Sequence, residues 1–420
     1  MSETKKKKNV TDAVLNRRAS VAFGAIAILM GIFLVIYIGV MLLGNPDMIS
    51  YESIYYMIND FNVAASTAGR DYTTLQYGFS FGQSQQYGEY RNGLVVLNES
   101  TLTCFSSSGK RTLYERISMT SPTLRTSELH VAAFEKGGSA CGIYNSFACL
   151  FTEADLGLAK ISNDYKIVDV CLADDGSFAV AMHTGFTHST ILLFNKRGVL
   201  SAEYSLSSLV TSVSLRNDGE AIAIASLLPD TEDAMPCGEL LVYRTGEKKP
   251  DTTQPIRDAI PISTAFTENG DLMCVHTRGL LFCDRADATV RSISFPTDEG
   301  LLGAELNEHG CIAYFYGDSP LESHGVKVFD KSAQMVYNVS VKDADAYPYH
   351  SYVLSANNLF CCADNGISVI DIKTGDVTRY AHGVSRDEAV LVPLRESGEV
   401  FAICGGSQAT KYELNEKSEG

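Results

Sequence analysis

One long apolar stretch stands near the start of the chain and differs from everything after it. No residue between Ala19 and Pro46 is charged, and Val21 to Gly44 is apolar or small throughout, which is enough to cross roughly 30 Å of hydrocarbon as a helix. The stretch is too long for a signal-peptide core of about 7–15 residues, and no small-residue cleavage site follows it. The pattern predicts an uncleaved transmembrane helix at 19–45.

The charges on either side of this stretch predict its orientation. Lys5 to Lys8, Arg17 and Arg18 precede it, and Asp47 and Glu52 follow it. Because basic flanks are retained on the cytoplasmic side of a membrane, we expect a cytoplasmic N-terminus and an extracytoplasmic remainder. The chain would then be a single-pass protein of the cell membrane.

Beyond residue 73 the hydrophobic pattern changes to short strands that recur every 40 to 51 residues. Each copy has an alternating strand, an Asp/Asn-Gly turn, a strand rich in Ala and Cys, a third apolar strand and, in most copies, a fourth. Glycine at the turn supplies the positive φ that a two-residue hairpin requires. This position is occupied by Gly176, Gly219, Gly270, Gly310 and Gly398, with Asn358 in a further copy.

Four antiparallel strands in a repeat of 40–50 residues are typical of a β-propeller blade. We therefore predict an all-β fold in which a single N-terminal transmembrane helix is followed by an eight-bladed β-propeller; seven blades is the alternative, because the first two repeats are degenerate. The last repeat lacks a fourth strand, which Thr74 to Phe81 would supply, closing the ring and removing an open edge. The expected parts are a basic cytoplasmic tail (1–18), the transmembrane helix (19–45), a stalk or linker (46–72), the extracytoplasmic propeller (73–415) and a polar C-terminal tail (416–420).

Charge narrows the range of partners. The formal net charge is −16, and the basic residues of the first eighteen positions leave the remainder still more acidic. Nucleic-acid recognition needs Lys and Arg to displace phosphate counterions, so we expect no nucleic-acid partner.

Two segments resemble a known family. Gly78 to Lys110 and then Ser121 to Gly138 are similar to membrane-anchored proteins of Gram-positive gut-type bacteria, the domain of unknown function 5711. The chain departs from that pattern at Ser80, where the family has Pro, and at Phe134 and Glu135, where it has Tyr and Asp. The resemblance implies a propeller outside the cytoplasmic membrane, and it implies no activity.

Catalytic and structural-metal motifs are missing from the sequence. There is no G-x-S-x-G, H-E-x-x-H or P-loop in a suitable context, and the eleven cysteines show neither C-x-x-C nor zinc spacing. Cys274, Cys311, Cys361 and Cys404 fall in second strands, where a free cysteine behaves as a small buried hydrophobe. An enzyme is therefore the less favoured hypothesis.

A propeller has two faces, and loop lengths distinguish them here. The face with the first-to-second and third-to-fourth turns (the turn face) is expected to be plain, because its turns are tight. The opposite face, with the second-to-third loops and the blade connections (the loop face), carries the long insertions, and such loops commonly bind partners. Acidic and aromatic candidates for binding on the loop face are Asp230, Glu232, Asp233, Asp298, Glu299, Asp318, Glu322, Asp343, Asp345, Tyr347, Tyr349 and Asp387.

These residues indicate a binding or scaffolding module for an envelope protein or ligand. Ca²⁺ could bridge such an acidic face because it takes several oxygen ligands, although no EF-hand loop is present and no cofactor is otherwise expected; solubilising surface charge is the plainer explanation. His183, His188, His324 and His350 also map to the loop face. The alternative function is an envelope hydrolase or lyase with its site at the mouth of the propeller channel.

Overall fold

The computed structural model divides the chain into two compact units, Met1–Ala68 and Gly69–Gly420. It describes residues 75–78, 85–145, 148–156, 165–229, 236–285, 289–295, 300–307, 310–319, 322–330, 332–340, 352–354, 358–363, 366–374, 376–381, 390–394, 400–405 and 408–413. All of these belong to the second unit, so the predicted tail, transmembrane helix and stalk lie outside the described residues. Within the described ranges, no helix has the length and apolar character needed to cross a membrane.

The described residues form eight antiparallel sheets of four strands, which we number along the chain. Sheet 1 contains β2 (Gln86–Tyr90), β3 (Gly93–Leu97), β4 (Thr101–Phe105) and β5 (Arg111–Arg116). Sheet 2 contains β6 (Pro122–Thr126), β7 (Val131–Glu135), β8 (Cys141–Tyr144) and β9 (Cys149–Thr152), followed by the short 3₁₀ turn η2 (Glu153–Leu156). Sheet 3 contains β10 (Lys166–Leu172), β11 (Phe178–His183), β12 (Ser189–Phe194) and β13 (Leu200–Leu206). Sheet 4 contains β14 (Leu209–Leu215), β15 (Ala221–Leu227), β16 (Gly238–Arg244) and β17 (Thr252–Ile256).

The second half of the chain repeats this plan. Sheet 5 contains β18 (Pro261–Phe266), β19 (Leu272–His276), β20 (Gly279–Cys283) and β21 (Val290–Ser294). Sheet 6 contains β22 (Gly300–Leu306), β23 (Ile312–Ser319), β24 (Glu322–Phe329) and β25 (Met335–Ser340). Sheet 7 contains β26 (Tyr352–Leu354), β27 (Asn358–Ala363), β28 (Gly366–Asp371) and β29 (Val377–Ala381). Sheet 8 contains β30 (Val390–Pro393), β31 (Val400–Gly405), β32 (Gln408–Glu413) and β1 (Leu75–Gly78).

The turn between the first two strands confirms the glycine requirement but not the predicted turn length. Gly176, Gly219, Gly270 and Gly310 have φ of +88°, +70°, +82° and +90°. Around Gly176 the hydrogen bonds run from Ala173 N to Ser177 O and from Gly176 N to Ala173 O, which makes a three-residue loop with the glycine in the left-handed region. Asn358 does not take this place, since it begins β27, and Gly398 lies outside the described residues.

The hydrophobic core is divided among the interfaces between consecutive sheets. Strands β3, β12 and β15 are buried along nearly their whole length, because both of their faces meet a neighbouring sheet. One cluster joins Ile143 of sheet 2 to Val180 of sheet 3. Fully burying side chains of this size contributes roughly 1.5–3 kcal/mol each, so every sheet depends on its neighbours for stability.

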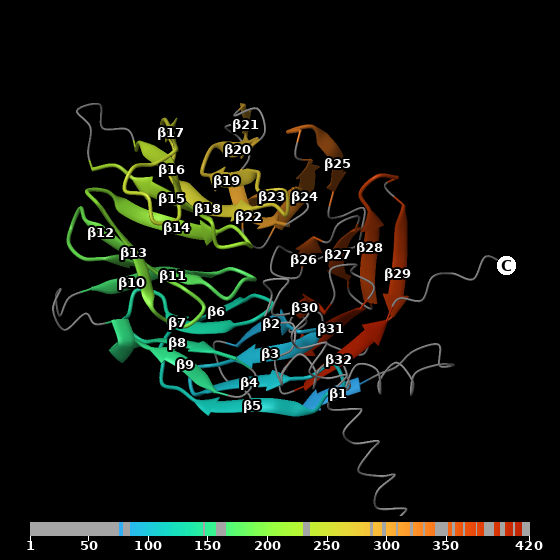
Figure 1. Cartoon of the computed structure of the whole chain (residues 1–420). Helices are drawn as coiled ribbons and strands as arrows, with labels where there is room; N and C mark the ends of the chain where they lie inside the picture. The colour runs from blue at the N-terminus through green and yellow to red at the C-terminus, as the bar shows by residue number, and fades with distance from the viewer. Residues whose placement is uncertain are drawn as a thin grey trace, which may run out of the picture. The chain divides into compact units, whose positions relative to one another are not determined.

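The last sheet also packs against the first, as Figure 1 shows where β30–β32 meet β2 and β3. Leu94 and Val96 of β3 share a buried cluster with Ala402 and Cys404 of β31. Strand β1 pairs with β32 from Leu75↔Lys411 to Gly78↔Gln408. The predicted closure is therefore confirmed: a strand from the beginning of the repeat region completes the last sheet.

Candidate functional site

Most of the residues that the sequence predicts on the loop face cannot be placed. Asp230, Glu232, Asp233, Asp298, Glu299, Asp343, Asp345, Tyr347, Tyr349 and Asp387 lie outside the described residues. Their proximity to one another is untested, and their role stays a prediction.

Asp318 and Glu322 fall in strands rather than in a long loop. Strand β23 ends at Ser319 and strand β24 begins at Glu322, and Ser319 is the register partner of Glu322. Two register shifts, around Gly317, let the pairing continue to the end of the hairpin. The segment 316–325, one of the long second-to-third insertions that the sequence predicts, is thus mostly extended backbone, and Asp318 lies one position from the Ser319↔Glu322 pair at the loop-face end of sheet 6.

The β11–β12 loop is one of the loop-face segments that the structure describes throughout. Phe186 at this loop is 99% exposed, so its ring has no packing role within the described residues. His183 Nε2 lies 2.9 Å from the backbone oxygen of Val210 in the next sheet, and His188 Nδ1 lies 3.1 Å from Thr187 Oγ1. His183 therefore links two sheets.

Polar groups on the first strands link four consecutive sheets. Asp169 of β10 accepts a hydrogen bond from Arg125 Nη2 of β6 at 3.2 Å and another from the backbone N–H of Val213 of β14 at 3.2 Å. Ser212 Oγ continues the chain of contacts to Thr264 of β18, accepting from its backbone N–H at 3.3 Å. Asp169 is 6% exposed, and burying its carboxylate charge without hydrogen-bond partners would be costly in free energy. This network supplies those partners.

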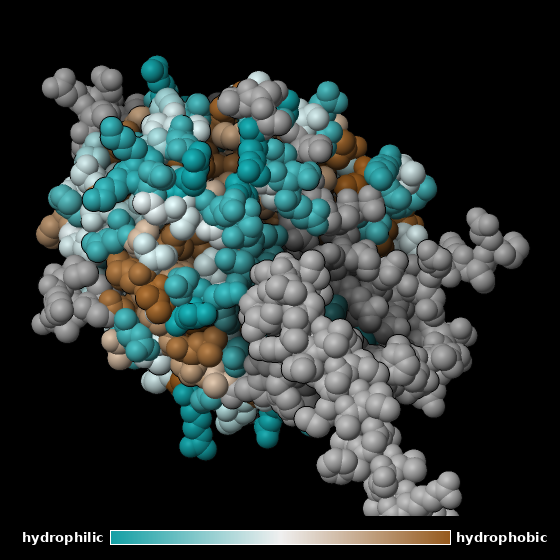
Figure 2. Space-filling model, viewed as in Figure 1, coloured by the Kyte–Doolittle hydropathy of each residue, from teal (hydrophilic) through white to brown (hydrophobic). Residues whose placement is uncertain are grey.

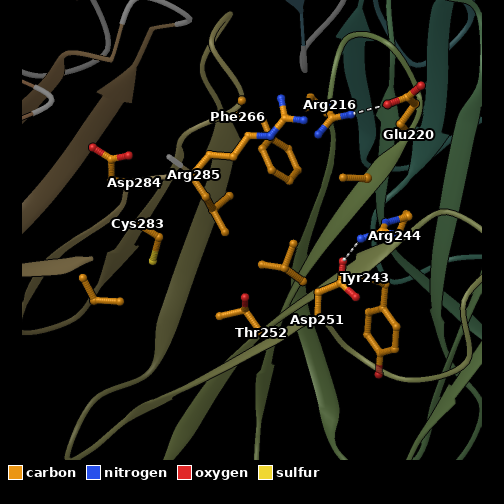
Figure 3. Close-up of a pocket in the computed structure, with 15 residues that line it drawn as sticks. Arg216, Glu220, Tyr243, Arg244, Asp251, Thr252, Phe266, Cys283, Asp284 and Arg285 are labelled. Carbon is orange, nitrogen blue, oxygen red and sulfur yellow. Dashed lines mark hydrogen bonds and ion pairs between the residues drawn. The ribbon is translucent and has the colours of Figure 1, made fainter. Parts of the chain in front are cut away.

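The turn face, expected to be plain, carries a cavity of about 480 Å³ between sheets 4 and 5. It is built by four turns, one at each of the β14–β15, β16–β17, β18–β19 and β20–β21 junctions (Figure 3). Over β14 to β21 the visible surface is largely hydrophilic (Figure 2). The lining combines charged and apolar side chains: Arg216, Glu220, Val242, Tyr243, Arg244, Asp251, Thr252, Phe266, Leu272, Cys283, Asp284, Arg285 and Val290 among them.

Two of the three cavity arginines are paired with carboxylates. Arg216 donates from Nε to Asp218 Oδ1 at 2.7 Å and from Nη2 to Glu220 Oε2 at 2.7 Å. Arg244 Nη2 lies 3.4 Å from Asp251 Oδ2, and this pair is largely exposed, so it contributes little to stability.

The third arginine of the cavity, Arg285, differs from Arg216 and Arg244. Its backbone N–H donates to Asp271 Oδ1 at 3.0 Å, but among the described residues its guanidinium makes no hydrogen bond or ion pair. In Figure 3 its side chain extends across the cavity toward Arg216, beside the ring of Phe266. The positive charge of Arg285 helps to lower the pKa of Asp218, but the guanidinium forms no hydrogen bond or ion pair with a carboxylate in the part of the chain that the structure describes.

Electrostatics keep these groups in their usual protonation states at neutral pH. The hydrogen bond that Arg216 donates to Asp218, together with the charges of Asp218 and Glu220, raises the pKa of Arg216 against the opposing effect of burial. Partial burial acts to raise the pKa of Asp218, but the hydrogen bonds from Arg216 and from the Glu220 backbone outweigh it and lower that pKa. Burial raises the pKa of the Cys283 thiol to about 11, so the thiol lines the cavity in neutral form.

Metal ligands do not gather in the part of the chain that the structure describes: it contains no group of three or more His, Cys, Asp or Glu side chains suited to a metal ion. The nine cysteines whose side chains the structure describes are unpaired, with Cys274 and Cys404 buried and Cys311 partly buried. The side chain of Cys361 is not described.

The cavity is not predictable from the sequence of any single repeat. Arg285 and Arg216 lie in turns that the sequence predicts to be plain surface. The sequence of one repeat does not determine the distance between that repeat and the next. A usable signal was present in the fourth strand of sheet 4, Thr252–Ile256, which has no aromatic residue to fill the space beside it.

Comparison with known families identifies the chain. A family model described as a family of unknown function, DUF5711, matches residues 69–403. The chain belongs to this family. The match includes β1 to β30 and most of β31, which agrees with the resemblance of the segments at Gly78–Lys110 and Ser121–Gly138.

Solved structures similar to this DUF5711 member are propellers. The C-terminal WD40 domain of Sif2 matches with a TM-score of 0.55 at 12% identity, covering 82% of this chain and 99% of that one. The Dos1 propeller matches with a TM-score of 0.54 at 10% identity, covering 82% and 96%. At such identities the likeness establishes the all-β propeller fold alone. A search of curated proteins found no match.

Proposed function

We propose that this DUF5711 chain is a membrane-anchored, extracytoplasmic, eight-bladed β-propeller that binds or scaffolds an envelope protein or ligand through its acidic loop face. Propellers of the WD40 type commonly serve as protein-binding scaffolds, and their rigid sheets present loops for that purpose. The eight four-stranded sheets of the described residues support the blade number.

The observation that carries the proposal is the strand order within each sheet. Because the four strands of sheets 1 to 7 follow one another in sequence order and are antiparallel, every second-to-third loop and every blade connection emerges on the same face. The acidic and aromatic segments at 228–237, 295–300 and 341–351 are all connections of these two kinds. A basic partner, or one bridged by Ca²⁺, would complement such a face.

Support for membrane anchoring comes from the sequence. The uncharged stretch at 19–45 is long enough to span a bilayer, and its N-terminal flank is basic. This places the ring outside the cell in the proposal.

Photocrosslinking in native membranes tests the binding function. Photoreactive residues are introduced at Asp233, Glu322 and Tyr349 on the loop face and at Asp174 and Asn217 on the turn face, and a C-terminal epitope reports whether the ring is accessible on intact cells. We expect a discrete protein adduct from the loop-face positions alone, together with surface accessibility of the epitope. Equal adducts from both faces, or none, would contradict binding through the loop face; an inaccessible epitope would contradict the extracytoplasmic location.

A further inference from the structure

We propose that the cavity between sheets 4 and 5 binds a small organic anion: a molecule with one carboxylate group and an apolar body. The cavity lies on the turn face, so this site is separate from the loop-face binding proposed above. Its failure would leave that proposal intact.

In the two preceding interfaces an aromatic residue fills this space. Between sheets 2 and 3, Phe151 of β9 packs against Phe178 and Phe194, with ring centroids 5.1 Å and 4.7 Å apart. Between sheets 3 and 4, Tyr204 of β13 packs on Tyr243 at 4.8 Å. In both cases an aromatic residue from a fourth strand occupies the outer part of the interface and excludes water from it.

Sheet 4 has no such residue. Its fourth strand, β17, reads Thr-Thr-Gln-Pro-Ile. Ile256 belongs to the buried cluster shared with sheet 5, while Thr252, an even number of positions away on the same side of the strand, lines the cavity. The volume of about 480 Å³ is therefore left open, and it falls within the range of roughly 300–1,000 Å³ that is usual for small-molecule sites.

Positive charge converges at one end of this space. A Cβ placed on Gly270 would lie 3.1 Å from Arg216 Cδ and 3.1 Å from both Cδ and Nη1 of Arg285, so the two arginine side chains approach each other over a residue that has no side chain of its own. Arg216 is committed to Asp218 and Glu220. Arg285 has no such partner among the described residues, and its planar guanidinium can donate two parallel hydrogen bonds to one carboxylate.

The remaining lining restricts the ligand further. Val242, Phe266, Leu272 and Val290 offer apolar surface to a hydrocarbon or aromatic body. Glu220, Asp251 and Asp284 also border the cavity, and their negative charges would repel a ligand with several anionic groups. The chemistry thus favours a single carboxylate over a polyphosphate or a polycarboxylate.

A titration of the full-length chain followed by ligand-observed NMR tests the site. The probes are 3-phenylpropionate, the neutral 3-phenylpropionamide and inorganic phosphate. We expect 3-phenylpropionate to bind more tightly than either other probe. Arg285→Gln should weaken it about tenfold or more, because a charged hydrogen-bond donor is lost, and Thr252→Trp should abolish binding by filling the cavity.

Arg197→Gln is the matched control. Arg197 is an exposed arginine in the third-to-fourth turn of sheet 3, and it does not line the cavity. Arg197→Gln should bind as the wild type does. Arg285→Gln and Arg197→Gln should keep the wild-type melting temperature within about 2 °C, as surface changes usually do, and Thr252→Trp should still unfold in one cooperative transition.

Four results would overturn the proposal. They are absence of 3-phenylpropionate binding to the wild type, equal affinity for the amide, full binding by Arg285→Gln, and full binding by Thr252→Trp. Tighter binding of a peptide that ends in phenylalanine than of 3-phenylpropionate would assign the cavity to peptide recognition and would also overturn the small-molecule proposal.

Discussion

His130 shows how a single polar side chain can tie the stability of this ring to pH. It precedes β7 on the turn face and is 6% exposed, and its Nδ1 is buried without a hydrogen-bond partner among the described residues. Burial, together with the nearby charge of Arg91, lowers the pKa of His130 to about 4. The imidazole is therefore neutral in the folded ring at neutral and mildly acidic pH.

Acidification should consequently destabilise the fold through His130. Between about pH 6.5 and pH 4 the unfolded chain binds a proton at this residue that the folded chain does not, so the free energy of unfolding falls as the pH falls. The loss attributable to His130 should reach about 3 kcal/mol near pH 4. Urea unfolding at pH 7.5, 6, 5 and 4.5 should show a shallower pH dependence for His130→Gln than for the wild type; parallel profiles would contradict this role.

At the scale of elements, the first strands are irregular in a repeated way. Register shifts between the first and second strands occur at Ile167/Asp169, Val210/Ser212, Pro261/Ser263 and Leu301/Gly303. A β-bulge redirects the side chains that follow it. Asp169 and Ser212, the residues directly after two of these shifts, are the ones that bond to neighbouring sheets.

Strand β1 closes the ring, so we expect the stability of the ring to depend directly on this strand. A chain of residues 85–420 lacks β1, which exposes the unpaired edge of β32, whereas a chain of residues 73–420 keeps the pairing of Leu75 to Gly78. We expect the shorter chain to unfold at a lower urea concentration and to aggregate, because an open edge invites pairing with another chain. Size-exclusion chromatography and urea unfolding measure both effects, and identical behaviour of the two chains would show that β1 contributes nothing.

At the scale of the whole ring, the sheets form a closed series, and each sheet buries apolar side chains against the sheets on either side of it. Asp169 contributes to this coupling because its carboxylate bonds to β6, to β14 and to the backbone N–H of Val170 on its own strand. A change at this residue removes acceptors from three sheets at once.

Asp169→Ala should therefore destabilise the ring by about 2–4 kcal/mol, since buried donors lose their acceptor. Glu203→Gln on the exposed side of β13 is the control and should change the free energy of unfolding by less than about 0.5 kcal/mol. Urea unfolding at neutral pH measures the free energy of unfolding of both variants. Arg125, which is half exposed, is unchanged in both. A small effect of Asp169→Ala would show that the sheets are held together by apolar packing alone.

The sequence by itself determined the repeated part of this protein. Strand alternation, glycine at a left-handed turn position and a period of 40–51 residues are local properties, so they predict the sheets, and a fourth strand missing at one end predicts that the other end supplies it. The predicted turn length was wrong, with three residues around Gly176 and four around Gly219 in place of two, because glycine at that position suits more than one hairpin loop.

Tertiary structure decided what happens between repeats. Whether Asp169 meets Arg125 depends on the distance between strands separated by about forty residues, and a bulge sets the direction of its side chain. The cavity arises because β17 has no aromatic residue, whereas β9 has Phe151 and β13 has Tyr204. That the guanidinium of Arg285 has no hydrogen-bonded carboxylate among the described residues is known only from what surrounds it. A local pattern encodes which strand forms, whereas packing between strands far apart in sequence decides which space is filled and which charge is left without a partner.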